Sequence, residues 1–134
     1  MDEKTGRGVP GWYWAVAGLA LAWEAYGAFI YTSQSLLDPG AREPGFANMA
    51  SWQWGVFALA VWSGVIGAVG LLLRKAWATW GLLVSLAAAA VQYGFAAMQS
   101  AIAPEARPIA VGVLVVGVGL VIFSSRARRA GWLS

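Results

Sequence analysis

Four runs of apolar residues, separated by polar segments, set the pattern of this chain. They cover approximately residues 12–31, 52–73, 76–98 and 108–125. A helix that rises about 1.5 Å per residue needs about 20 residues to cross the hydrocarbon core of a bilayer. The first three runs reach that length, and the last is at the lower limit. The pattern predicts an all-α protein, an integral membrane four-helix bundle that forms a single transmembrane domain over residues 1–134.

The segments between the runs predict short connections. Residues 32–50 hold two Pro-Gly pairs, which are typical of turns, so we predict the longest loop there. Arg74 and Lys75 form a tight basic turn, and residues 99–107 form a short connection. Residues 1–10 are polar, and we expect them to be disordered.

Composition indicates a lipid environment. The chain of 134 residues is 60% hydrophobic and 11% charged, with a mean hydropathy of +0.64. A soluble domain of this length needs more charge to cover its surface. The chain has no cysteine and no histidine, which excludes disulfides, thiolate nucleophiles, zinc–thiolate sites and a histidine haem ligand. We expect no enzyme activity, no catalytic residue, no metal, no cofactor and no nucleic-acid partner.

The basic residues predict the orientation. An even number of spans places both termini on one side, together with the Arg74–Lys75 turn. That side holds seven of the nine bases, and the other side holds two. The seven are Lys4, Arg7, Arg74, Lys75, Arg126, Arg128 and Arg129, and the two are Arg42 and Arg107. The positive-inside rule then predicts cytoplasmic termini, and we interpret the first run as an uncleaved anchor.

Small residues on one face of a helix indicate close helix packing in lipid. One such face is Ala60-xxx-Gly64-xxx-Ala68 in the second run, and another is Gly81-xxx-Ser85-xxx-Ala89 in the third. The last run carries Gly112, Gly117 and Gly119. These faces predict either an ordinary compact bundle or, most of all for the last run, a contact with a second copy.

Glu24 is the one acidic residue inside the apolar runs. A carboxylate at that depth is expensive, so we expect a partner or a function for it. Counting about 1.5 Å per residue places Glu24 about 18 Å and Gln92 about 24 Å from the cytoplasmic edge, with Trp62 and Ser63 at about 14–15 Å. We therefore predict a candidate buried polar cluster of Glu24, Gln92, Ser63, Trp62 and Tyr26.

Two interpretations of this cluster remain open. In the first, Glu24 and Gln92 form a buried hydrogen-bonded clip. In the second, Glu24 is a protonatable site in a cavity that ions or substrates reach. No Lys or Arg lies at that depth, so burial favours the uncharged form of Glu24 in either case.

The strings WYWAVAGLALAWEAYG, FALAVWSGVIGAVGLLLRKAWA and SLAAAAVQYG resemble small four-span bacterial inner-membrane proteins that are often labelled "sugar transporter", a label with no established mechanism. This resemblance implies a multi-pass protein of the bacterial inner (cytoplasmic) membrane and transfers no site residue. The string Leu21-Ala22-Trp23-Glu24 is also similar to small multidrug resistance transporters, which have an essential glutamate in the first of four spans. The long segment 32–50 and the strong charge bias depart from that family.

Two functions follow as expectations. The first is an accessory or structural subunit, or a lipid-associated helical bundle, with no catalytic site. The alternative is an oligomeric small-molecule or proton-coupled transporter that uses Glu24. In both cases we expect membrane lipids as partners, and a homo-oligomer or a larger membrane complex.

Overall fold

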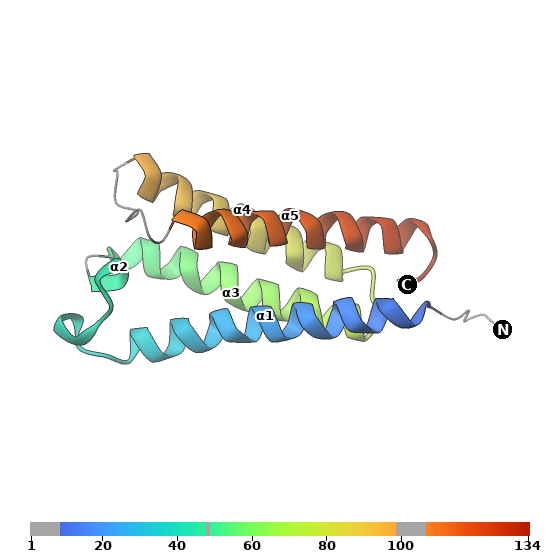
Figure 1. Ribbon diagram of the computed structural model, residues 1–134, viewed down its shortest axis with the longest axis horizontal. Helices are drawn as coiled ribbons and strands as arrows, with labels where there is room; N and C mark the ends of the chain where they lie inside the picture. Colours follow the sequence, from blue (N-terminus) through green and yellow to red (C-terminus); the bar gives the residue numbers. More distant parts are fainter. Residues whose placement is uncertain (1–8, 48, 99–106) are drawn as a thin grey trace.

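The computed structural model describes residues 9–47, 49–98 and 107–134. Within these residues, four long helices lie side by side, and the start of the first helix and the C-terminal residue lie at the same end (Figure 1). The long helices are α1 (Gly11–Ser35), α3 (Ser51–Leu72), α4 (Ala78–Met98) and α5 (Arg107–Arg129). Two short helices, η1 (Pro39–Ala41) and α2 (Pro44–Ala47), lie between α1 and α3. The predicted all-α architecture of four long helices is confirmed.

Three helices of the described residues are long and apolar enough to cross a membrane, namely α3, α4 and α5. Helix α5 has 23 residues and exceeds the expected length, because it continues through the three arginines of its last turn. Cations are favourable there, next to the negative end of the helix dipole. Helix α1 has 25 residues but is not among the three. Its tryptophans, tyrosines and Glu24 lower its hydropathy, so its passage through the membrane stays a prediction.

The end of α1 differs from the expectation. Helix α1 continues four residues into the segment predicted as a loop, and the polar side chains of this extension bond to carbonyl groups of the preceding turn. Thr32 Oγ1 donates to the Ala28 carbonyl at 2.8 Å, and Ser33 Oγ donates to the Ile30 carbonyl at 3.1 Å. Residues 1–8 of the tail predicted over residues 1–10, and most of the connection predicted over residues 99–107, lie outside the described residues.

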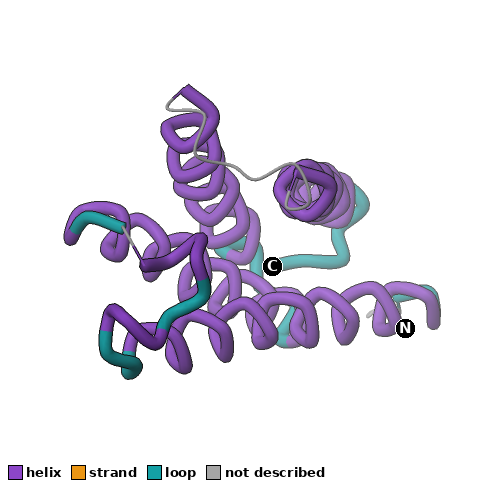
Figure 2. Tube along the Cα trace, turned by 60° about the vertical axis from the view of Figure 1, so that its left-hand side comes forward, coloured by secondary structure: helices purple, strands orange, loops and turns teal. Residues whose placement is uncertain are grey.

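Helix α3 holds the bundle together, since it packs against both α1 and α4, while α5 packs against α4. Glycines allow α3 and α4 to approach closely. A Cβ added to Gly67 would lie 2.8 Å from the backbone nitrogen of Leu82, and one added to Gly81 would lie 2.9 Å from Gly67 Cα. The small-residue faces predicted on these two helices therefore meet. In Figure 2, α5 is seen nearly end-on while α1 runs across the picture, so these two helices are not parallel.

An aromatic cluster joins α1 to α5 at the end that carries the C-terminus. Tyr13 is fully buried, and its hydroxyl donates to the Leu71 carbonyl of α3 at 2.5 Å. The rings of Trp12 and Tyr13 each contact those of Phe123 and Trp132. The start of α1 is thereby fixed to both α3 and the end of α5.

The C-terminal tail binds the turn between α3 and α4. The Ser134 nitrogen donates to the Arg74 carbonyl at 3.0 Å, and Arg74 Nε donates to the Trp132 carbonyl at 2.9 Å. Arg74 has a φ of 56°, in the left-handed region, which lets the chain reverse sharply. The predicted tight basic turn is confirmed, and hydrogen bonds between Arg74 and the backbone of the tail hold it in place.

The opposite end of the bundle is closed by a second aromatic cluster. Tyr31 contacts Trp54 and Phe57, and Phe46 stacks on Phe57. Arg42 donates from Nε to the Gln34 carbonyl at 3.0 Å, which satisfies one of the last carbonyls of α1. The loop between α1 and α3 is therefore folded back against the ends of both helices.

The Gly81→Ala substitution tests the close α3–α4 contact. The new methyl group would meet backbone atoms of α3, which cannot move aside as a flexible side chain can. We expect a loss of about 1–3 kcal/mol in the free energy of unfolding, measured by reversible unfolding in mixed micelles.

Gly94→Ala, on the same helix, is the matched control, because no heavy atom lies within 4 Å of the added Cβ. We expect it to be neutral or stabilising by up to about 1 kcal/mol. Equal stability of the two variants would contradict the packing described here.

Candidate functional site

Glu24 lies near the middle of α1, on the face that packs against α3. A Cβ added to Gly64 of α3 would lie 2.3 Å from Glu24 Oε1, so the carboxyl group rests directly on the bare backbone of this glycine. The same Cβ would lie 2.9 Å from Ser85 Oγ of α4. The acid of α1 and the hydroxyl of α4 therefore both border the space that a side chain at position 64 would otherwise fill.

The Glu24 carboxyl group is available to bind a proton or a cation, because the described residues do not engage it in hydrogen bonds. Ser85 Oγ donates to the Ala60 carbonyl of α3 at 2.6 Å, which leaves its lone pairs free to accept. Among the described residues, no hydrogen bond or ion pair reaches Glu24. A carboxyl group in this position can hold a proton, exchange it, or attract a small cation.

Gln92 lies apart from this site. Its Nε2 donates to Met49 Sδ at 3.9 Å, and its buried Oε1 has no hydrogen-bond partner among the described residues. Gln92 is two helical turns beyond Ser85 on α4, which is roughly 10 Å along the axis, toward the loop end of the bundle. The structure therefore pairs Gln92 with the segment before α3, and the expected Glu24–Gln92 hydrogen bond is not formed.

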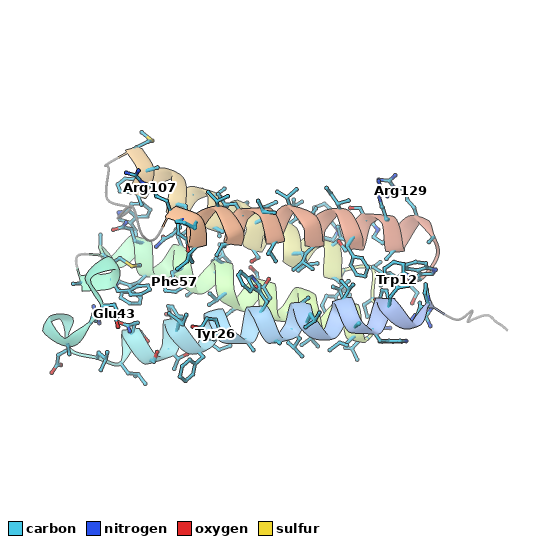
Figure 3. All side chains as sticks on the ribbon, viewed as in Figure 1. Trp12, Tyr26, Glu43, Phe57, Arg107 and Arg129 are labelled. Carbon is cyan, nitrogen blue, oxygen red and sulfur yellow. The ribbon has the colours of Figure 1, made fainter. Side chains whose placement is uncertain are left out.

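Ser63, Trp62 and Tyr26 do not join Glu24 either. Ser63 Oγ donates to the Leu59 carbonyl of its own helix. Tyr26 is 62% exposed and Trp62 is 45% exposed (Figure 3 labels Tyr26). Each lies two positions from a residue of the site, Glu24 or Gly64, and a step of two rotates a side chain by about 200° around a helix. Depth along the membrane is similar for these residues, but direction is not.

Sequence reasoning did not assign Gly64 and Ser85 to the site. Both were noted only as members of small-residue faces, Ala60-xxx-Gly64-xxx-Ala68 and Gly81-xxx-Ser85-xxx-Ala89. The missing step was to combine two observations. An acid at mid-depth on α1 needs a small residue opposite it on the neighbouring helix, and a serine in a small-residue face is the polar group able to reach it.

The described residues offer no other site of this kind. They contain no group of three or more His, Cys, Asp or Glu side chains that could hold a metal ion. A shallow depression of about 280 Å³ lies between α3 and α4, and its lining is apolar. Its lining residues are Val56, Leu59, Val84, Ala87, Ala88 and Val91. Such a surface suits an acyl chain or an apolar side chain rather than a polar substrate.

No protein-family model, curated protein or solved structure matches this chain. The two resemblances described from the sequence therefore stay expectations, and the site is assigned from its geometry alone. The long apolar helices show that the chain is a small multi-pass helical membrane protein.

A double-mutant cycle tests the contact between Glu24 and Gly64. Gly64→Ala places a methyl group where the carboxyl group lies, so we expect a loss of about 1–3 kcal/mol in the free energy of unfolding. Glu24→Ala removes the obstacle, so we expect a coupling energy of about 0.5–3 kcal/mol between the two substitutions.

The control cycle pairs Glu24→Ala with Gly112→Ala, because a Cβ added to Gly112 meets no heavy atom within 4 Å. The changes that these two substitutions cause in the free energy of unfolding should be additive. Additivity in the Glu24–Gly64 cycle as well would disprove the contact.

Proposed function

We propose that the protein is an accessory or structural membrane subunit, a lipid-associated helical bundle with no catalytic site of its own. The observation that carries this proposal is the outer surface of α5. Its large apolar side chains are exposed at every turn, at Ile109, Val111, Val115, Val118 and Ile122. In a bilayer, this surface is covered by acyl chains or by another helix.

Open glycines on α5 support a protein partner. A Cβ added to Gly112 or to Gly119 would meet no heavy atom within 4 Å. The two residues are seven positions apart, so they lie on the same face of the helix. Small residues on a lipid-facing helix let a second helix approach closely, which favours a homo-oligomer or a larger membrane complex.

The distribution of basic residues supports cytoplasmic termini in a bacterial inner membrane. Arg129 lies at the end with the C-terminus and Arg107 at the opposite end, as Figure 3 shows. Among the described residues, Arg74, Lys75, Arg126, Arg128 and Arg129 belong to the first end, and Arg42 and Arg107 to the second. An excess of Lys and Arg on one side of the membrane is typical of the cytoplasmic side.

Native purification in mild detergent, followed by mass spectrometry, tests the subunit proposal. We expect a stable partner to purify with the wild-type chain and with Glu24→Gln, since the amide fills the same space. A Gly112→Leu/Gly119→Leu variant should lose the partner, because the added side chains block the face on α5.

Gly94→Leu is the control, since this glycine of α4 is also open but lies on another helix. It should keep the partner. A chain that purifies alone in every variant would rule out the subunit proposal.

One observation favours a second candidate, an oligomeric small-molecule or proton-coupled transporter that uses Glu24. The carboxyl group of Glu24 has no partner among the described residues, although it lies between helices and beside the hydroxyl of Ser85. Unpaired ionisable groups inside membrane proteins commonly mark ion or proton pathways.

Transport in proteoliposomes separates this candidate from the first. If Glu24 carries the coupled proton, Glu24→Gln should abolish uptake of the transported molecule. Any uptake that remains should not depend on pH. Glu43→Gln, in the exposed loop, should leave uptake unchanged. A wild-type profile that is flat with pH would eliminate the proton-coupled mechanism.

A further inference from the structure

Two basic segments that are distant in sequence meet at the C-terminal end of the bundle. Lys75 belongs to the turn between α3 and α4, and the last turn of α5 holds Arg126, Arg128 and Arg129. The hydrogen bonds between the tail and this turn bring the two segments together. We call Lys75, Arg126, Arg128 and Arg129 the basic end.

The tail–turn bonds make this arrangement specific. Besides the bonds between Arg74 and the tail, the Ala76 nitrogen donates to the Ser134 carbonyl at 3.4 Å. Leu133, between the bonded residues, is buried in the core. The end of α5 is thus held against the turn, so that all four side chains of the basic end belong to the same end of the molecule.

The charge of the basic end is not balanced by acids in the described residues. All four side chains are exposed. Of the described acids, Asp38 and Glu43 lie in the loop at the opposite end, and Glu24 lies within the bundle. Residues 1–8 contain two acids and two bases, so their side chains add no net charge.

Exposed tryptophans indicate the depth of the basic end in a bilayer. Trp12, at the start of α1, and Trp77, just before α4, are both about half exposed. Tryptophans collect at the level of the lipid headgroups, and arginine binds phosphate through two parallel hydrogen bonds. Together these residues place guanidinium groups at the level of the lipid phosphates.

We propose that the basic end is a binding site for the phosphate groups of anionic phospholipid headgroups. A lipid fits better than free phosphate, because the exposed apolar side chains of Ile122 and Leu73 begin directly next to the basic residues. A bound lipid is thereby held at both its headgroup and its acyl chains. This inference requires only that the chain lies in a membrane, and it rests on neither role proposed above.

Native mass spectrometry of the full chain in mild detergent tests the proposal, with phosphatidylglycerol and phosphatidylcholine as the added lipids. We expect the wild type to retain phosphatidylglycerol in preference to phosphatidylcholine. A variant with Gln at all four positions of the basic end should bind phosphatidylglycerol at least about tenfold more weakly than the wild type does. Arg42→Gln/Arg107→Gln, with changes at the opposite end only, is the control and should bind as the wild type does.

Further measurements keep the test decisive if the four-fold variant does not fold. Replacing Arg126, Arg128 and Arg129 by Lys keeps the charge but loses the paired hydrogen bonds of the guanidinium groups, so binding should fall between that of the wild type and that of the four-fold variant. Wild-type binding should weaken as salt is raised from about 0.05 to about 0.5 M, because salt screens exposed charges. Inorganic phosphate at millimolar concentration should not displace the lipid.

Three results would each overturn the proposal. The first is equal retention of the two lipids by the wild type. The second is equal weakening by the substitutions at the two ends. The third is displacement by inorganic phosphate alone, which would identify free phosphate as the ligand. None of these results depends on whether a protein partner or a transported substrate is found.

Discussion

The close approach of α3 to its two neighbours is the constraint on which the rest of the structure depends. In lipid, helices gain little from burying apolar side chains, so they associate through close backbone packing. Gly67 and Gly81 let α3 and α4 touch almost backbone to backbone. About one helical turn before Gly67, Gly64 leaves room for the side chain of Glu24 beside Ser85 of α4. The glycines of one helix therefore both organise the bundle and admit an acid into it.

The same constraint explains how α1 is held in place. Its mid-section is less apolar than that of the other long helices, so lipid alone is a poorer environment for it. One end is fixed by the hydrogen bond from the Tyr13 hydroxyl to the Leu71 carbonyl, and the other by the ring contact of Tyr31 with Phe57. Between these anchors, Glu24 faces α3. Helix α1 thus depends on α3 for its position, whereas α3 and α4 form the stable pair.

The sequence predicts the elements of the fold well, because apolar run length and turn residues are local properties. It also predicts that α3 and α4 carry small-residue faces for close packing, but not which helix each face meets. It does not predict the docking of Trp132 and Ser134 onto Arg74, because these hydrogen bonds use backbone groups of the tail, which leave no pattern in the sequence. The site was predicted in part. Glu24 was found from its depth, but depth alone does not give the direction in which Trp62 and Tyr26 point.

The passage of α1 through the bilayer, with Glu24 inside it, is the central claim, and cysteine accessibility tests it most directly. The chain has no cysteine, so single cysteines at Gly11, Ala25 and Ser35 can be labelled with a membrane-impermeant maleimide in sealed vesicles. If α1 crosses the membrane, Gly11→Cys reacts from one side only, Ser35→Cys reacts only from the other, and Ala25→Cys reacts from neither. Labelling of Gly11→Cys and Ser35→Cys from the same side would contradict the account.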